Sequence, residues 1–291
     1  MLSKSLELRV RSLRAGELDR LAAFLARLNV QPEHHIGYCG VDELEILHAL
    51  QHSDEVPTQE AFALAERGDQ LVGAFGFDAD LETGHLELWG PFAEGDDRVG
   101  VAEKLWRSLE WPPKMTRLEL FCNAENGLCA DFAFHQGFAE GPRAQILGAV
   151  PGPDAEIVPM LEPRDFDAFV ALHDTLFPGT YYSGAAILTR LGPHRRVFAE
   201  RDVSGLCGYV YAEVAPKFGE GSLEFVGVAL RARGLGLGAK LVRSALAWTF
   251  SFGVREMTLT LSAHDEAARR LYRRAGFTLR HEMRAFRKAV V

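Results

Sequence analysis

The sequence predicts an α+β protein, built on mixed α/β sheets, in which two similar domains follow one another. At 291 residues the chain is long for one compact core, because domains usually span roughly 100–200 residues. The same order of strand and helix patterns occurs twice, and matching glycines keep nearly the same offset: Gly100 corresponds to Gly236, and Gly137 to Gly276. We therefore expect a tandem duplication, with domains at 1–150 and 151–291. One continuous α/β domain with loosely alternating elements is the alternative.

Each half follows the order strand, helix, hairpin, strand, helix, strand, helix, strand. Helices are predicted where apolar residues recur every three or four positions, and hairpins where turn residues separate two apolar runs. In the first half the elements are expected at 7–13, 17–28, 65–75 (the hairpin), 86–89, 98–109 and 116–122, before a helix that ends at 137–138. In the second half they are expected at 157–161, 164–176, 199–210 (the hairpin), 223–228, 235–250 and 256–261, before a helix that ends at 276–277. The boundary is expected in the Gly- and Pro-rich segment 148–153.

Charge argues against nucleic acid as a partner. The net charge is −8, whereas nonspecific nucleic-acid binding depends on a basic surface. The arginine-rich run 269–274 is interrupted by Leu271 and Tyr272 at helical spacing, so we interpret it as a solvated helix face rather than a nucleic-acid patch. An acidic protein can also attract a cationic amine.

Composition favours a cytoplasmic protein without a membrane partner. No apolar run approaches the roughly 20 residues that cross a bilayer, and the N-terminus lacks the apolar stretch of a secretory signal. The four cysteines form no C-x-x-C pair, and we interpret them as small buried apolar residues rather than as a disulfide framework. The sequence makes no prediction of the oligomeric state.

A glycine-rich turn after a predicted strand is the strongest functional signal. It follows the strand at 226–228 and runs through Arg233, Gly234, Gly236 and Gly238 into an amphipathic helix. Glycines let the backbone approach a ligand closely, and the free N–H groups at a helix start attract anions. Arg233 can add charge-assisted donors, so the turn suits a pyrophosphate. Its spacing differs from the dinucleotide fingerprint G-x-G-x-x-G, and the Gly-Lys-Ser/Thr of a Walker A loop is absent.

Two motifs of the second half resemble those of one enzyme family. The spacing Arg233-x-x-Gly236-x-Gly238 resembles the R/Q-x-x-G-x-G/A signature of the GNAT acetyltransferase superfamily. The run 265–277 resembles the family's N-x-x-A-x-x-L-Y-x-x-x-G-F helix, with Asp265 where asparagine is usual. The resemblance implies two tandem GNAT-like domains, each with a mostly antiparallel central sheet that is flanked by helices and splayed at the cofactor cleft.

The resemblance also implies a donor and the residues that hold it. Acetyl-CoA is expected between the strands at 226–228 and 256–261, with no metal. The residues implied in binding it are Val226, Gly227, Val228, Arg233, Gly234, Leu235, Gly236, Leu237, Gly238, Ala239, Asp265, Ala268 and Tyr272.

Two side chains are candidates for the proton transfers. An alkylammonium must lose a proton before it attacks a thioester, and Glu224 is the candidate base. Strand alternation is expected to place Glu224 on the face of Val226 and Val228, whose backbone N–H groups are candidates to polarise the thioester carbonyl. Glu224 could equally be a solvated or substrate-binding residue, and Glu213 is a second candidate base. Tyr272 stands where family members have the tyrosine that protonates the departing thiolate; a packed core tyrosine is the alternative reading.

Other signals are weaker. The run Tyr181-Tyr182-Ser183 lies where the family's acceptor pocket is usually walled, and it could contact substrate or simply cover a short helix. The pair His34-His35 has no third ligand at metal spacing and is interpreted as a loop pair.

The first half lacks the features that bind the donor. In the repeat alignment Asp97 stands opposite Arg233, and Asp96-Asp97 would repel a pyrophosphate. Asn126 matches the asparagine of the family's helix motif, but Ala133 occupies the place of Tyr272. We therefore interpret the first half as a degenerate copy that acts as a scaffold or shapes the acceptor site.

The functional hypothesis is an N-acetyltransferase. It would move an acetyl group from acetyl-CoA to a primary amine of a small molecule or peptide, by direct attack in a ternary complex. A non-catalytic acyl-CoA sensor and an enzyme of the same fold with a different acyl donor are the alternatives. The acceptor is left open among a polyamine, an aminoglycoside, an amino acid, a thiol-sugar amine and a protein N-terminus.

Overall fold

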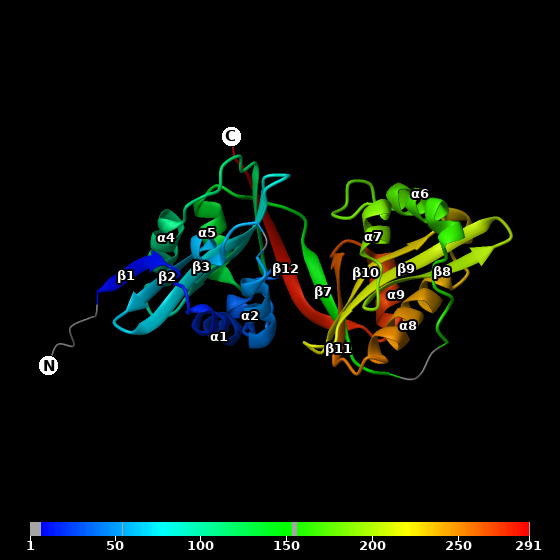
Figure 1. Ribbon diagram of the computed structural model, residues 1–291, viewed down its shortest axis with the longest axis horizontal. Helices are drawn as coiled ribbons and strands as arrows, with labels where there is room; N and C mark the ends of the chain where they lie inside the picture. The colour runs from blue at the N-terminus through cyan, green and yellow to red at the C-terminus, as the bar shows by residue number, and fades with distance from the viewer. Residues whose placement is uncertain (1–6, 54, 153–155, 291) are drawn as a thin grey trace. The chain divides into compact units, whose positions relative to one another are not determined.

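A computed structural model describes residues 7–53, 55–152 and 156–290 (Figure 1). The N-terminal segment and the end of the predicted linker at 153 lie outside the described residues. The chain divides into two compact units: unit 1 is Met1–Ala144 with His281–Val291, and unit 2 is Gln145–Arg280. The sequence predicted a single boundary between residues 150 and 151. The last strand, β12 (Thr278–Ala289), adds a second crossing, because it continues from unit 2 into unit 1.

Unit 1 contains one mixed sheet with the strand order β1-β2-β3-β4-β5-β12. The β4–β5 pair is parallel and the other pairs along this path are antiparallel, so the sheet is mostly antiparallel, as predicted. Its elements are β1 (Leu8–Ser12), α1 (Leu18–Asn29), η1 (Pro32–His34), α2 (Glu43–Gln51), α3 (Thr58–Ala61), β2 (Phe62–Arg67), β3 (Gln70–Asp80), β4 (His85–Ala93), α4 (Arg98–Ser108), β5 (Arg117–Asn123), α5 (Gly127–His135) and β6 (Ala139–Glu140).

Unit 2 contains a sheet with the strand order β7-β11-β10-β9-β8. The β10–β11 pair is parallel, whereas β10 and β8 each pair with β9 in antiparallel fashion. Its elements are β7 (Ala144–Ala149), η2 (Pro163–Asp165), α6 (Phe166–Leu176), α7 (Gly184–Arg190), β8 (Arg195–Asp202), β9 (Gly205–Ala215), β10 (Glu220–Val228), η3 (Leu230–Ala232), α8 (Leu237–Phe250), β11 (Glu256–Ser262) and α9 (Glu266–Arg274). The fold class predicted from the sequence is confirmed.

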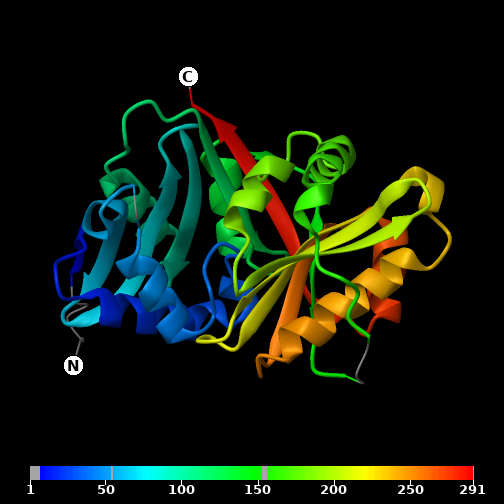
Figure 2. The same ribbon diagram turned by 45° about the vertical axis from the view of Figure 1, so that its right-hand side comes forward.

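The two faces of the unit 2 sheet carry separate cores. One core packs the sheet against α8 and α9 and includes Leu223, Leu241 and Trp248. The other packs the sheet against α6 and α7 and includes Phe169, Tyr209 and Phe225. Figure 2 shows α8 on one side of this sheet and α6 with α7 on the other. A side chain of β10 can therefore be assigned to a face by the core that it joins.

The strand expected at 157–161 is not formed. This segment runs beside β8 with a single bridge, Met160 to Phe198, and two flanking hydrogen bonds, Leu161 N–H to Val197 O at 2.8 Å and Ala199 N–H to Pro159 O at 2.9 Å. Proline has no N–H to donate, so Pro159 interrupts a regular ladder. Among the described residues, no helix is long and apolar enough to span a membrane.

Candidate active site

The parallel strands β10 and β11 pair over a short stretch and then diverge. Their register covers Glu220 with Glu256, Gly221 with Met257, and Ser222 with Thr258. Beyond these pairs, β10 continues to Val228 and β11 continues to Ser262. The facing edges of the two strands therefore no longer hydrogen-bond to each other, which is the splay that the family resemblance implied.

A β-bulge in β10 marks the start of this divergence. Leu223 lies opposite Ala212 and Phe225 lies opposite Tyr211, which leaves Glu224 as the extra residue. Leu223 joins the core under α8, whereas Phe225 joins the core under α6 and α7.

The bulge changes the face on which Glu224 lies. Val226 and Val228 pack against the α8 core, but Glu224 accepts a hydrogen bond from Tyr181, which precedes α7 on the other face. The prediction from strand alternation, that Glu224 shares the face of the two valines, was wrong. Strict alternation holds only for a regular ladder, and one extra residue shifts it by one position. Glu224 therefore lies on the face of the sheet that α6 and α7 cover.

The residues before α7 lie around Glu224. The Tyr181 hydroxyl donates to Glu224 Oε2 at 2.6 Å, and burial together with the Glu224 charge raises the pKa of that hydroxyl. The Tyr182 ring lies 4.2 Å from the guanidinium carbon of Arg190. Ser183 instead begins α7, because its hydroxyl accepts the N–H of Ala186 at 3.2 Å.

Glu213, the second candidate base, is held by its neighbours. It accepts hydrogen bonds from Tyr211, from Arg190 at 3.0 Å and from Arg195 at 2.9 Å. Burial acts to raise the pKa of Glu213, but these hydrogen bonds together hold it below its ordinary value. A carboxylate so stabilised as an anion is a poor proton acceptor, which favours Glu224.

The glycine-rich turn ends in a helix start that no side chain caps. Gly236 is the N-cap of α8, with a φ of 78°, and the first helical bond of the turn joins Lys240 N–H to Gly236 O at 3.2 Å. The N–H groups of Leu237, Gly238 and Ala239 then have no partner within the helix. An added Cβ at Gly234 or Gly236 would meet no atom within 4 Å, so the space before these donors is open.

Arg233 lies between the turn and the open end of β10. Its Nε–H donates to the carbonyl oxygen of Val228 at 3.1 Å, and among the described residues it forms no ion pair. Its neighbours Arg231 and Lys240 are paired with Asp202 and Glu200. Within the described part of the chain, the Arg233 guanidinium is thus a cation near this helix start that no carboxylate neutralises.

The second motif forms α9. Asp265 caps this helix by accepting the N–H of Ala268 at 2.8 Å, a contact that the usual asparagine could also make. Tyr272 is 7% exposed and packs edge-on against Phe277. Burial, and then the charge of Asp265, raise the pKa of Tyr272, so its hydroxyl keeps its proton.

The surroundings of Gly238 and Gly227 show how closely β10, α8 and α9 pack against their neighbours. An added Cβ at Gly238 would lie 3.4 Å from Leu271 and 3.9 Å from Val228, which places the first turn of α8 beside α9 and the end of β10. An added Cβ at Gly227 would lie 2.5 Å from Tyr209, so only glycine fits there. Leu235 is 72% exposed in the turn.

Comparison with known proteins identifies this part of the chain. Residues 166–277 match the model of the acetyltransferase (GNAT) family. Unit 2 carries a GNAT acetyltransferase domain. The chain is 26% identical over 204 residues to mycothiol acetyltransferase from Pseudarthrobacter chlorophenolicus, covering 62% of this chain and 62% of that protein. It is 45% identical over 60 residues to 5-NmdU N-acetyltransferase from Pseudomonas phage PaMx11, covering 21% of this chain and 41% of that protein. The chain thus spans less than two thirds of either curated relative.

Solved structures show that the resemblance of fold extends beyond the GNAT domain of unit 2. The chain superposes on a GCN5-related N-acetyltransferase from Sphaerobacter thermophilus with a TM-score of 0.71 and 17% identity, over 97% of this chain and 95% of that one. It superposes on a tandem GNAT protein from the clavulanic acid biosynthesis pathway with a TM-score of 0.62 and 14% identity, over 97% and 98%. The fold is therefore that of tandem GNAT proteins.

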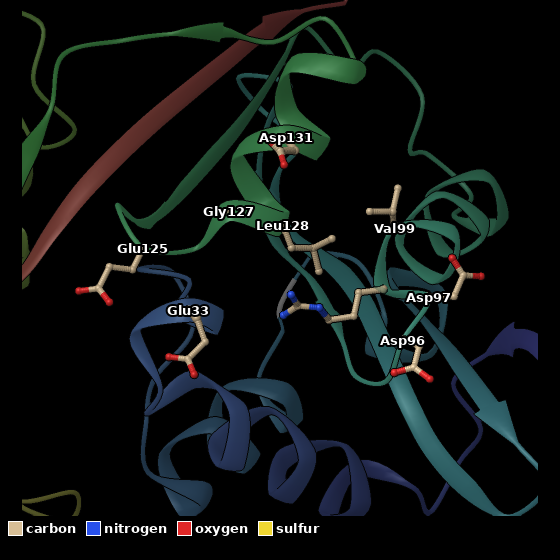
Figure 3. A pocket seen from close by; sticks show the side chains of 9 residues that line it. Glu33, Asp96, Asp97, Val99, Glu125, Gly127, Leu128 and Asp131 are labelled. Atoms are coloured by element: carbon tan, nitrogen blue, oxygen red, sulfur yellow. The ribbon is translucent and has the colours of Figure 1, made fainter.

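Unit 1 has a different helix start at the position that corresponds to the glycine-rich turn of unit 2. Asp97 caps α4 by accepting the N–H of Gly100 at 3.1 Å. One of the N–H groups at the start of α4 is therefore already bonded to a carboxylate and is not free to bind an anion. A groove of about 540 Å³ lies at this position, lined by Glu33, Asp96, Asp97, Arg98, Val99, Glu125, Gly127, Leu128 and Asp131. Figure 3 shows how the labelled acidic side chains lie around it. Five of these side chains are carboxylates, which repel a pyrophosphate.

The strands of unit 1 also diverge, but the chain itself fills the opening. The parallel β4–β5 register ends at Glu87 with Glu119. Past that point the segment 35–37 pairs with β5: Gly37 N–H donates to Phe121 O at 2.6 Å, and Asn123 N–H donates to His35 O at 3.0 Å. In the GNAT domain of unit 2 the matching edge of β11 is unpaired with β10.

Side chains fix this inserted segment in place. Asn29 Oδ1 accepts the N–H of Ile36 at 2.6 Å, and Ile36 is fully buried. The His35 ring stacks 4.0 Å from His281 and hydrogen-bonds through Nδ1 to Asn29 O at 2.8 Å. Burial lowers the pKa of His35 to about 4. Among the described residues, no cluster of His, Cys, Asp or Glu could hold a metal ion.

The sequence missed three of these features: the inserted segment, the bulge at Glu224 and the bond from Tyr181. Of the consecutive histidines at 34 and 35, only His35 stands in the inserted segment, and its pairing with β5 gives it a structural role. Many residue types can occupy the extra position of a β-bulge such as that at Glu224, so a single sequence does not reveal the bulge.

We expect the full chain to bind one equivalent of CoA. Unit 1 offers an acidic groove and a filled opening, whereas unit 2 offers uncapped N–H donors and Arg233. Calorimetry on the whole chain measures the stoichiometry; separate halves cut at 150 would remove β12 from the unit 1 sheet. Binding of two equivalents of CoA would contradict this assignment. So would binding of one equivalent by a variant that lacks the glycine-rich turn from Arg233 to Gly238.

Proposed function

We propose that unit 2 is an acetyl-CoA-dependent N-acetyltransferase that acetylates a primary amine by direct attack in a ternary complex. The observation that carries the proposal is the uncapped, glycine-started helix α8 at the open end of the diverging strands β10 and β11. The two relatives, a mycothiol acetyltransferase and a 5-NmdU N-acetyltransferase, support the same chemistry.

The donor fits the charge and shape of the turn. The three free N–H groups at the start of α8 and the guanidinium of Arg233 together suit the pyrophosphate of CoA. Open space before Gly234 and Gly236 lets phosphate oxygens approach the backbone. Bound acetyl-CoA would supply an activated acetyl thioester between β10 and β11.

Residues of unit 2 then carry the protons. Glu224 takes the proton of the ammonium acceptor from the α6–α7 side, directly or through water, so that the nitrogen has a free lone pair. The backbone N–H groups at Val226 or Val228 donate to the thioester oxygen. Tyr272 donates its proton to the departing thiolate, and the second proton that the nitrogen loses on becoming an amide restores the tyrosine through water. The pKa of Tyr272, raised by burial, keeps its proton in place until the thiolate leaves.

A thiol-release assay over a panel of amines tests the proposal. Release of free thiol from acetyl-CoA that depends on a primary amine supports it. CoA binding without turnover of any amine would indicate a non-catalytic acyl-CoA-binding module. Turnover with another acyl-CoA but not with acetyl-CoA would show that the donor was misassigned. The fold assignment would remain valid.

Glu224→Gln should slow the reaction at neutral pH by roughly 10²–10⁴-fold, the range for general base catalysis. Raising the pH toward the amine's own pKa, roughly 10, should restore much of the rate, because the amine then arrives neutral. Rate against pH for the wild type and the variant measures this rescue. If Glu224 merely attracts the cationic substrate, its loss would instead raise KM, and raising the pH would not lower KM again.

Glu162→Gln provides a matched control for this variant. Glu162 is an exposed carboxylate of unit 2 that pairs with Arg164. It should show the wild-type profile. Full activity of Glu224→Gln at every pH would remove Glu224 as the base, while the donor assignment would stand.

A further inference from the structure

An exposed aromatic ring stands beside the proposed base, on the face of the unit 2 sheet that α6 and α7 cover. Tyr181 is 65% exposed, although its hydroxyl donates to Glu224 Oε2 at 2.6 Å. Its ring centroid lies 5.0 Å from that of the buried Phe225 ring, at an interplanar angle of 32°. Because Phe225 covers one face of the ring and Glu224 takes the hydroxyl, the exposed area lies on the other face and at the outer edge.

Hydrogen bonds from α6 hold the backbone that follows Tyr181. His173 of α6 is fully buried, and its Nε2–H donates to the carbonyl oxygen of Tyr182 at 2.9 Å. Asp174 Oδ1 accepts the N–H of Gly184 at 2.7 Å. Since the loop and the Tyr181 ring are already held, a ligand that stacks on this ring loses little binding free energy to ordering it.

The charges around the two tyrosines suit a ligand with one ammonium group. Glu224 forms no ion pair within the described part of the chain, so it can pair with a cation of the ligand. Arg190 and Arg195 both pair with Glu213, at 3.0 Å and 2.9 Å, so two cations share one carboxylate and leave an excess of positive charge. The rings at 181 and 182, with centroids 4.8 Å apart, connect Glu224 to the Arg190 guanidinium, whose carbon lies 4.2 Å from the second ring. A second ammonium group on the ligand would therefore be repelled.

We infer that the acceptor is an arylalkylamine, a monoamine whose short alkyl chain carries an aromatic ring. This inference rests on the proposed function. The ammonium group pairs with Glu224, and the ring of the acceptor stacks on the open face of Tyr181 in the offset arrangement that aromatic pairs prefer. Stacking removes from water an apolar surface that Tyr181 otherwise exposes. Once the amine has lost its proton, its nitrogen forms the new C–N bond, the C–S bond of the thioester breaks, and the products are the N-acetyl amide and free CoA.

Polyamines and aminoglycosides fit this face less well. Each carries several ammonium groups, whereas Glu224 can pair with one of them and the positive charge of Arg190 and Arg195 opposes the others. The same charges explain why a single positive group is the preferred feature of the acceptor.

The test measures kcat/KM for amine-dependent thiol release from acetyl-CoA with two matched pairs of amines. Phenylpropylamine and cyclohexylpropylamine have the same number of non-hydrogen atoms, but only the first has a flat aromatic ring. Phenylpropylamine should be the better acceptor by roughly three- to tenfold, the size of an aromatic pair beyond the area that it buries. Hexylamine should likewise be better than hexamethylenediamine, which adds a second ammonium group. Equal values within the first pair, or a diamine as good as hexylamine, would overturn the inference and leave the proposed function intact.

Two variants of Tyr181 separate its ring from its hydroxyl. Tyr181→Ala removes the ring and should bring the ratio of kcat/KM for phenylpropylamine to that for cyclohexylpropylamine to about one. Tyr181→Phe keeps the ring that packs on Phe225 and should keep the wild-type ratio. Because both amines are measured on the same protein, the ratio is unaffected by a general loss of activity or of folded protein. Phe134→Ala, which removes a 51% exposed ring of unit 1, is the matched control and should keep the ratio.

Each remaining outcome contradicts a stated part of the assignment. A preference for phenylpropylamine that persists in Tyr181→Ala would show that the acceptor does not stack on Tyr181. A preference that is lost in Tyr181→Phe would assign it to the hydroxyl and also overturn the stacking. The absence of thiol release with all four amines, in a protein that binds CoA, would instead contradict the proposed function.

Discussion

Gly236→Asp is expected to abolish CoA binding and leave unit 2 folded. The new carboxylate would stand at the start of α8, where N–H groups and Arg233 are proposed to meet phosphate. Two like charges about 4 Å apart near a protein surface repel by roughly 4 kcal/mol, which is about a thousandfold in affinity. The backbone cost is small by comparison: aspartate enters the left-handed region more readily than most residues, at roughly 1 kcal/mol, and the added Cβ meets no atom within 4 Å.

Gly253→Asp separates strain from ligand repulsion. Gly253 follows α8 at its other end, has a φ of 74° and is equally free of close neighbours. The two variants should unfold at similar denaturant concentrations, whereas calorimetry should detect CoA binding in Gly253→Asp alone. Unchanged CoA affinity in a folded Gly236→Asp protein would mean that the turn does not hold the phosphates.

The sequence was sufficient to predict the turn because its physics is local. A strand, a run of glycines and an amphipathic helix in direct succession dictate an uncapped helix start, and the structure has that start at Gly236. The same reasoning placed the C-terminal end of α9, which Gly276, with a φ of 98°, follows. Such features depend on residues a few positions apart, so one sequence displays them.

Features that depend on distant partners were not predictable. The face of Glu224 is decided by its register with β9, where Tyr211 and Ala212 flank the extra residue. The filled opening of unit 1 depends on Asn29 and β5, which are far apart in the chain. No periodicity records a pairing between a loop and a strand edge, so the first half could be interpreted as degenerate from its charges but not from its closed opening.

The C-terminal strand shows the same limit for domain boundaries. Met283 to Ala289 pair with β5 of unit 1, so a unit that began at the N-terminus is completed by the end of the chain. The chain passes between the two units twice. A Pro- and Gly-rich segment indicates the first passage, but the second lies inside the continuous strand β12, which contains no turn residues. Any attempt to test the two halves separately must keep this strand with unit 1.

Tyr272→Phe should lower turnover by roughly 10²–10⁴-fold and leave acetyl-CoA affinity nearly unchanged, because only the proton donor is lost. The ring still packs against Phe277 at a centroid distance of 5.7 Å. The Tyr272 hydroxyl has no hydrogen-bond partner among the described residues, so removing it leaves no buried group unsatisfied and should cost little stability. A chemical role is expected because Tyr272 stands in the helix motif at the position where family members have their thiolate-protonating tyrosine.

Single-turnover rates with saturating acetyl-CoA and amine measure the chemical step itself. Tyr38→Phe is the matched control: it removes the hydroxyl of a tyrosine of unit 1 that donates to Glu119 at 3.2 Å, and it should keep the wild-type rate. If proton donation to the thiolate limits the reaction, the Tyr272→Phe defect should shrink with an acyl donor whose thiol is more acidic, because that leaving group departs without help. An equal rate for Tyr272→Phe and wild type in the single-turnover experiment would reduce Tyr272 to a packing residue. A defect that persists unchanged with the more acidic thiol would indicate that Tyr272 positions the donor instead of protonating it.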